Sequence, residues 1–181
     1  YKARGLDIPN NNLNGKVAAL DYLTASNRLS FGDRVKEFEI GTFNASGKKV
    51  VVIGGGDTAM DCVRTAVRQG ATSVKCFYRR DRANMPGSQR EVQNAEEEGV
   101  IFEWLTSPKG LSSNLRNPDL LNLKAQEGDL KGIIVQKMRL GDPDATGRRT
   151  PEEIIGSEYL EEADLVIEAL GFEPEDLPTL W

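Results

Sequence analysis

The sequence of 181 residues contains no histidine and only two cysteines. Without histidine, the chain cannot form a Ser-His-Asp triad, a histidine-ligated zinc site or a histidine general base. Cys62 and Cys76 lie 14 positions apart, which fits neither a metal-binding motif nor a Cys-x-x-Cys dithiol. Two thiols are also too few for an iron–sulfur cluster. We therefore expect no metal site or redox centre within this chain, and we interpret both cysteines as small apolar packing residues.

Long apolar segments and an excess of positive charge are also missing. No apolar run approaches the roughly 20 residues that span a bilayer, and no signal-peptide pattern opens the chain. The 23 basic and 28 acidic residues give a net charge of −5, which disfavours general nucleic-acid binding. Together with the few thiols, these features predict a cytoplasmic protein that binds neither membranes nor nucleic acid. Because the sequence begins at Tyr1 without methionine, we expect a segment of a longer protein.

The apolar residues that are present predict an α/β fold built on parallel strands. A β-branched run at residues 49–53 is typical of a strand buried on both faces, and the pattern over 57–69 indicates an amphipathic helix. A second strand at 73–78 completes a βαβ unit of ordinary length, and a third strand is expected at 100–105.

Two further helices are expected around this unit. Residues 1–15 are polar and are interpreted as a surface connection, which leads into an amphipathic helix over 16–29 with Asn14 as its N-cap. The Ser-x-x-Glu sequence at 88–91 has the spacing of a capping box and predicts a helix over 88–98.

The pattern changes in the last third of the chain. Three strand-like segments at 120–125, 132–140 and 154–160 are separated by turn residues, which predicts a three-stranded antiparallel β-meander, and a final strand is expected at 163–170. The predicted fold is therefore an α/β, Rossmann-like open parallel sheet flanked by helices, with the antiparallel meander on one face.

A glycine-rich loop joins the first strand of the βαβ unit to its helix. It consists of Gly54, Gly55, Gly56, Asp57, Thr58 and Ala59. In the G-x-G-x-x-A pattern, Gly54 permits the tight turn, Gly56 lets a pyrophosphate approach the backbone, and Ala59 allows close packing of helix on strand. The amides at the start of the helix would then face the phosphates. The alternative is a glycine-rich turn without a ligand, in which Asp57 favours the first helical turn by its charge; Thr58 is equally consistent with a cap or a phosphate contact.

The end of the second strand predicts which dinucleotide is bound. NAD sites place an acidic residue about 20 positions beyond the loop, where it holds the ribose 2′-hydroxyl. Here Arg79 and Arg80 occupy that place, and two guanidinium groups would instead bind a 2′-phosphate. The sequence therefore predicts an NADP(H) site, the alternative being a solvated basic corner balanced by Asp81.

The motifs taken together resemble the NADPH-dependent glutamate synthase small (beta) subunit family. The resemblance rests on Val-Ile-Gly-Gly-Gly-Asp-Thr-Ala-Met-Asp-Cys at 52–62, Tyr-Arg-Arg-Asp at 78–81, Met-Pro-Gly-Ser at 85–88 followed by Glu91, Gly-Asp-Pro-Asp-Ala-Thr-Gly-Arg-Arg at 141–149 and Ala-Leu-Gly-Phe-Glu-Pro at 169–174. It divides the single NADP(H)-binding domain, residues 1–181, into a connecting segment with a helix at 1–47 and a nucleotide-binding core at 48–175.

The resemblance implies a flavoprotein in which NADPH passes hydride to FAD. Electrons would then travel through iron–sulfur clusters to a large subunit that makes glutamate from 2-oxoglutarate and glutamine-derived ammonia. The implied partners are the FAD domain of the same chain and the glutamate synthase large subunit. By motif, the glycine-loop residues would lie along the pyrophosphate, Arg79 and Arg80 would hold the 2′-phosphate, and Ala169 and Gly171 would pass near the nicotinamide.

The sequence also departs from that family. The cysteine-rich cluster region, the first FAD glycine motif and the C-terminal Gly-Asp motif are absent from these residues, so we expect this segment alone to be colourless and inactive. Thioredoxin-reductase-like and dihydropyrimidine-dehydrogenase-like flavoproteins share the same half-motifs, and a non-catalytic nucleotide-binding module is a further alternative. The segment 85–88 is equally consistent with a loop leading into a capped helix and with a ligand contact. Residues 106–123 match no motif.

Overall fold

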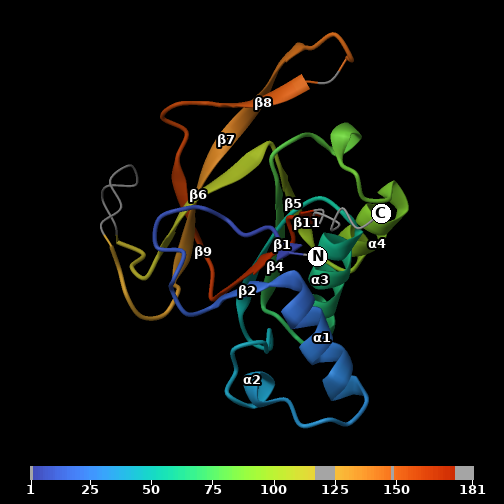
Figure 1. Ribbon diagram of the computed structural model, residues 1–181, viewed down its shortest axis with the longest axis vertical. Coiled ribbons are helices and arrows are strands. Elements are labelled where there is room, and N and C mark those ends of the chain that lie inside the picture. Colours follow the sequence, from blue (N-terminus) through green and yellow to red (C-terminus); the bar gives the residue numbers. More distant parts are fainter. Residues whose placement is uncertain (1, 117–124, 148, 174–181) are drawn as a thin grey trace, which may run out of the picture.

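A parallel sheet of five strands forms the centre of the computed structural model, which describes residues 2–116, 125–147 and 149–173 (Figure 1). Neighbouring strands follow the order β2-β10-β3-β4-β5, and every pair is parallel. The strands are β2 (Lys16–Ala18), β3 (Lys49–Ile53), β4 (Ser73–Tyr78), β5 (Ile101–Trp104) and β10 (Leu165–Glu168). The Rossmann-like parallel sheet that the sequence predicts is confirmed.

Helices cover one face of this sheet. They are α1 (Ala19–Ser30), α3 (Asp57–Arg68) and α4 (Gln89–Glu97), while the short α2 (Lys36–Glu39) and a 3₁₀ helix, η1 (Arg82–Asn84), lie in the connections. Val50 and Val52 of β3 pack with Tyr22 and Met60 of the helices in one buried cluster. Among the described residues, no helix combines the length and the apolar character needed to cross a membrane.

An antiparallel sheet covers the other face. It consists of β6 (Thr106–Ser112), β7 (Gly132–Pro143), β8 (Arg149–Glu153) and β9 (Tyr159–Glu162), and the β7–β8 hairpin extends beyond the parallel sheet at the top of Figure 1. Val51 and Ile53 point to this side and pack with Ile133 of β7. Side chains alternate across a strand, so β3 needs apolar residues at every interior position because both of its faces are buried.

The strand predicted at 132–140 is confirmed as part of β7, but the other strands of this layer begin and end at other residues than the sequence predicts. Of the expected strand at 154–160, only residues 159 and 160 belong to a strand, β9; residues 155 and 156 form a turn, in which Gly156 has a φ of 81° and Ile155 is 92% exposed. Residues 106–112, which matched no motif, form β6, in which Pro108 and Gly110 flank a break in the register. Of the strand predicted at 120–125, residues 120–124 lie outside the described residues. The antiparallel layer is confirmed, but it has four described strands rather than three.

The N-terminal prediction is corrected as well. Residues 16–18 form β2 instead of the first helical turn, and Val17 pairs with Ile167 of β10. Asn14 does not cap α1, since its side-chain amide donates to Asp129 Oδ1 over 3.3 Å. The short strands β1 (Lys2–Ala3) and β11 (Phe172–Glu173) pair antiparallel, so both ends of the described chain meet.

The capping box predicted at the start of α4 does not form. Ser88 occupies the N-cap position, but its side chain makes no capping hydrogen bond. Glu91 instead accepts a hydrogen bond from Arg64 Nη1 of α3 over 2.7 Å, and Arg64 Nε donates to Glu98 over 2.8 Å. Glu91 therefore forms a contact between α3 and α4 instead of the capping hydrogen bond that its spacing from Ser88 predicts.

Candidate functional site

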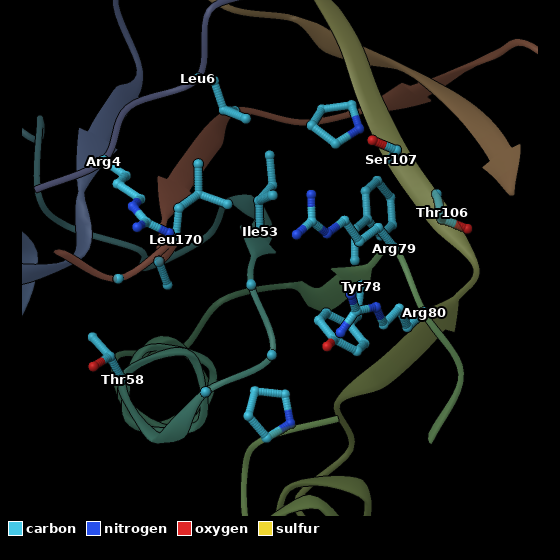
Figure 2. Close-up of a pocket in the computed structure, with 18 of the residues that line it drawn as sticks. Arg4, Leu6, Ile53, Thr58, Tyr78, Arg79, Arg80, Thr106, Ser107 and Leu170 are labelled. Atoms are coloured by element: carbon cyan, nitrogen blue, oxygen red, sulfur yellow. The ribbon is translucent and has the colours of Figure 1, made fainter. Parts of the chain in front are cut away.

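A cavity of about 710 Å³ lies where the parallel strands β3, β4 and β10 end (Figure 2). Its wall comes from five parts of the chain, namely residues 4–8, residues 53–56 with Thr58, residues 77–80 with Asn84 and Pro86, residues 106–108 and residues 169–171. Ligands of open α/β sheets bind at the carboxyl ends of the strands, and this volume falls within the range of small-molecule sites. The fold thus brings the glycine loop, the two arginines and residues 169–171 together around one cavity.

The first glycines of the loop are required by the fold itself. Gly54 has a φ of 149°, and a Cβ atom there would lie 2.2 Å from the carbonyl oxygen of Ala169. A Cβ atom on Gly55 would lie 2.5 Å from the ring of Tyr78. Neither position has room for a side chain, whatever the cavity holds.

Gly56 is different, because no described residue requires glycine at this position. Its φ of −94° and ψ of 177° are accessible to any residue, and, apart from its chain neighbours, no atom of the described residues lies within 4 Å of the position that a Cβ would take. Gly56 lines the cavity and is the N-cap of α3, where no side chain caps the free amides of the first turn. The open space beside these amides suits a phosphate group.

The other three loop residues differ in position. Thr58 lines the cavity, whereas Ala59 is fully buried in the core between α3 and the sheet. The carboxylate of Asp57 accepts a hydrogen bond from the backbone N–H of Ser88 over 3.3 Å, and Asp57 does not line the cavity. Ala59 therefore lies where the close-packing role that the sequence assigns to it would place it.

Positive charge gathers on the wall of the cavity. Arg79 is exposed, Arg80 is half-buried, and the Nε atom of Arg80 is buried without a hydrogen-bond partner. In Figure 2 the Arg79 side chain extends from β4 into the space between Ile53 and Ser107, while Arg80 turns another way. The predicted balancing acid does not face them: Asp81 accepts from the backbone N–H of Asn84 over 3.0 Å and caps η1.

Arg4 is a third basic residue at this cavity, and the sequence analysis missed it. It lies on the far side of Ile53 from Arg79, next to Leu170 (Figure 2). Within the described part of the chain, Arg4, Arg79 and Arg80 form no ion pair, and Asp7 is the one acidic residue of the cavity wall. An anionic ligand in the cavity would therefore balance the positive charge of these arginines by charge-assisted hydrogen bonds.

Ala169 and Gly171 follow β10 and form the wall next to Arg4. The N–H of Ala169 donates to the carbonyl of Ile53 over 2.8 Å, and the carbonyl of Gly171 accepts from the N–H of Arg4 over 3.0 Å. Leu6 is held to the same edge, because its N–H donates to the buried carboxylate of Glu168. No local sequence pattern predicts that residues 4–8 reach this cavity.

The two cysteines are free and fully buried, as the sequence predicts for packing residues. Burial raises the pKa of the Cys76 thiol to about 12 and raises the pKa of Cys62 well above its usual range. Both are thus protonated thiols at neutral pH, and neither lines the cavity.

Comparison with known proteins identifies the family. The sequence profile of the family described as pyridine nucleotide-disulphide oxidoreductase matches residues 2–178. The chain belongs to this family. One relative is a Cereibacter sphaeroides protein with the provisional name glutamate synthase (NADPH) small chain. It is 65% identical over 182 residues, which cover 100% of this chain and 40% of that protein. The glutamate synthase (NADPH) small chain of Azospirillum brasilense is 58% identical over 98% of this chain and 34% of its own length.

These relatives confirm the family resemblance drawn from the motifs, and this pyridine nucleotide-disulphide oxidoreductase chain spans less than half of their length. Among solved structures, Mycobacterium tuberculosis FprA in complex with NADPH has a TM-score of 0.71 at 18% identity, over 98% of this chain and 49% of the other. That likeness confirms the fold.

Proposed function

We propose that this chain is the NADPH-binding domain of a glutamate synthase small subunit, and that NADPH bound in the cavity presents its hydride to an FAD held elsewhere in the same polypeptide. The family membership supports an NADPH-dependent oxidoreductase, and the names of the 65% and 58% identical relatives support glutamate synthase. The domain would comprise residues 1–181, with its nucleotide-binding core at 48–175.

The proposal rests chiefly on one observation: arginines that form no ion pair with any described residue lie beside the open glycine loop in a single cavity. Gly56 and Thr58 would lie along the pyrophosphate, because their surroundings combine free helix-start amides with unfilled space. The resemblance also assigns Gly54, Gly55, Asp57 and Ala59 to the pyrophosphate. In this proposal Gly54 and Gly55 would act by shaping the loop, and Asp57 and Ala59 by supporting it.

Arg79 and Arg80 would hold the ribose 2′-phosphate. A buried guanidinium Nε without a partner is unfavourable unless a ligand supplies the missing acceptor, and phosphate oxygens are strong acceptors. No acidic residue of the described cavity wall stands at the end of β4 to hold a 2′-hydroxyl instead. The site should therefore prefer NADPH to NADH.

The nicotinamide end would lie toward Ala169 and Gly171, with Arg4 as an additional neighbour. NADPH supplies a hydride when it is bound. The described residues of this chain contribute binding and orientation, since both cysteines are buried protonated thiols outside the cavity. FAD, iron–sulfur clusters and a large subunit would belong to the rest of the enzyme. There the electrons from NADPH would be used to form glutamate from glutamine and 2-oxoglutarate.

Parallel calorimetric titration with NADPH and NADH tests this function. We expect NADPH to bind at least about tenfold more tightly, because one charge-assisted hydrogen bond contributes roughly 1.5–3 kcal/mol. A higher salt concentration should reduce the difference in affinity between NADPH and NADH, because Arg79 is exposed and salt screens its charge. Equal affinities would contradict the assignment of the arginines, and no binding of either cofactor would contradict the proposed function itself.

A further inference from the structure

The Met-Pro-Gly-Ser segment at 85–88 has no role in the function proposed so far, yet it folds back onto the glycine loop. After Arg80 the chain forms η1 and then turns toward α3. Met85 is buried in the core cluster beneath the helices, and Pro86 lines the cavity. The segment thus connects the arginine end of β4 with the phosphate end of the cavity.

Two backbone groups of this segment bind the loop. The N–H of Gly87 donates to the carbonyl oxygen of Gly55 over 2.8 Å, and the N–H of Ser88 donates to Asp57 Oδ1 over 3.3 Å. Gly55 lines the cavity in which a pyrophosphate would lie, and Asp57, which does not line it, stands between the lining residues Gly56 and Thr58. One dipeptide therefore holds the carbonyl and the carboxylate that would otherwise repel the phosphates.

The bond to Gly87 also fixes the direction of an amide. A trans peptide places its carbonyl and its N–H on opposite sides, so a Gly55 carbonyl that points to Gly87 directs the Gly56 N–H away from the segment. Gly87 is buried, and a Cβ atom on it would lie 3.0 Å from the Gly55 oxygen and 3.5 Å from the Gly56 carbonyl carbon. A side chain at this position would press on the Gly55 carbonyl, because the two backbones approach closely.

Tyr78 attaches the segment on its other side. Its ring lies against Gly55, and its hydroxyl donates to the carbonyl of Asn84 over 3.0 Å. Asn84 in turn is held by Asp81, the residue that follows the two arginines. The contacts form a continuous connection from β4 to the glycine loop.

We propose that residues 84–88 are a positioning clamp for the glycine loop, in which Gly87 and Ser88 bind the Gly55 carbonyl and the Asp57 carboxylate so that the loop presents amides, and not oxygens, to the pyrophosphate. Gly87 is a positioning residue, because it acts through Gly55. The inference rests on the proposed NADPH function and extends it to a segment to which that function assigns no part.

Gly87→Ala tests the clamp in the purified protein, titrated with NADPH and with adenosine 2′-monophosphate, which carries the 2′-phosphate but no pyrophosphate. The added methyl group would displace the Gly55 carbonyl by a few tenths of an ångström. We expect NADPH affinity to fall about tenfold, comparable to one charge-assisted hydrogen bond, while adenosine 2′-monophosphate affinity changes less than about twofold. Gln93→Ala in α4 is the control, because Gln93 is exposed, its side chain donates to Glu97 and it lines no part of the cavity; its affinities should equal those of the wild type.

Tyr78→Phe provides a second variant that adds no atoms, should Gly87→Ala fail to fold in a thermal melt. It removes the hydrogen bond from the hydroxyl to Asn84 and keeps the ring against Gly55. We expect NADPH affinity to fall by about two- to tenfold, while the affinity for adenosine 2′-monophosphate again changes less than about twofold. Unchanged NADPH affinity in a folded Gly87→Ala variant, or equal losses for both ligands, would overturn the clamp. A wild-type protein that binds no NADPH would overturn the proposed function and the clamp with it.

Discussion

Replacing Gly56 with valine should remove dinucleotide binding with little effect on folding stability, which no other change in the glycine loop is expected to do as clearly. In the described part of the chain, no atom beyond the neighbouring residues lies within 4 Å of the Cβ position, and the backbone at Gly56 has φ −94° and ψ 177°, which valine adopts readily. The new side chain would instead occupy the space proposed for the pyrophosphate. We expect Gly56→Val to fold and to lose dinucleotide binding.

The two effects differ greatly in magnitude. Valine is a poorer N-cap residue than glycine, which costs at most about 1 kcal/mol of stability, equivalent to roughly 2–4 °C in melting temperature for a chain of this size. Loss of two charge-assisted bonds to phosphate oxygens would weaken NADPH binding by about 3–6 kcal/mol, on the order of a hundredfold to ten-thousandfold.

Calorimetric titration and a thermal melt on the same samples would measure both effects. Gly54→Ala is the contrasting variant in the same loop, because its Cβ would lie 2.2 Å from a backbone oxygen, so we expect it to lose at least about 2–3 kcal/mol of stability. Gly56→Ala should give an intermediate loss of affinity with wild-type stability. Normal NADPH binding by a folded Gly56→Val protein would refute the argument, since the loop would then not face the cofactor.

Three further predictions concern other parts of the chain. Changing both Arg79 and Arg80 to alanine should weaken NADPH by at least about tenfold and NADH little, as measured by calorimetry, and equal losses would exclude them as 2′-phosphate ligands. Burial raises the pKa of Cys76 from 9.0 to about 12, so the folded chain keeps a proton that the unfolded chain loses, and the free energy of unfolding should fall as the pH rises above about 9. Urea titrations at several pH values would measure this slope, which should be shallower in Cys76→Ala, whereas rapid reaction of native Cys76 with a thiol reagent near pH 8 would contradict its burial. The purified segment should show no flavin absorbance and no NADPH oxidation with artificial electron acceptors, and a stoichiometric bound flavin would mean that the loop holds a different cofactor.

The sequence by itself determined the β3–α3–β4 unit and the loop within it. The alternation and glycine punctuation of residues 49–78 act over short distances, so neighbouring residues specify these elements without help from the rest of the chain. The same locality explains why the position of the two arginines at the end of β4 was predictable. It also explains the recognition of the family from short motifs.

Tertiary structure decided the elements whose partners lie far along the chain. Residues 16–18 have a helical pattern, but they form a strand because Val17 pairs with Ile167 of β10. β6 contains Pro108 and Gly110, which weaken any local strand signal, and it exists through its pairing with β7. Glu91 binds Arg64 of a neighbouring helix instead of the cap that its spacing predicts.

The composition of the candidate site divides in the same way. Gly54, Gly56 and Arg79 could be predicted because a single βαβ unit carries them, and their roles toward the cofactor stay predictions. Arg4 lines the cavity through the contact of residues 4–8 with the end of β10, and Gly87 meets the glycine loop because the chain folds back after β4. Such contacts depend on the positions of whole elements, which no periodicity of neighbouring residues encodes.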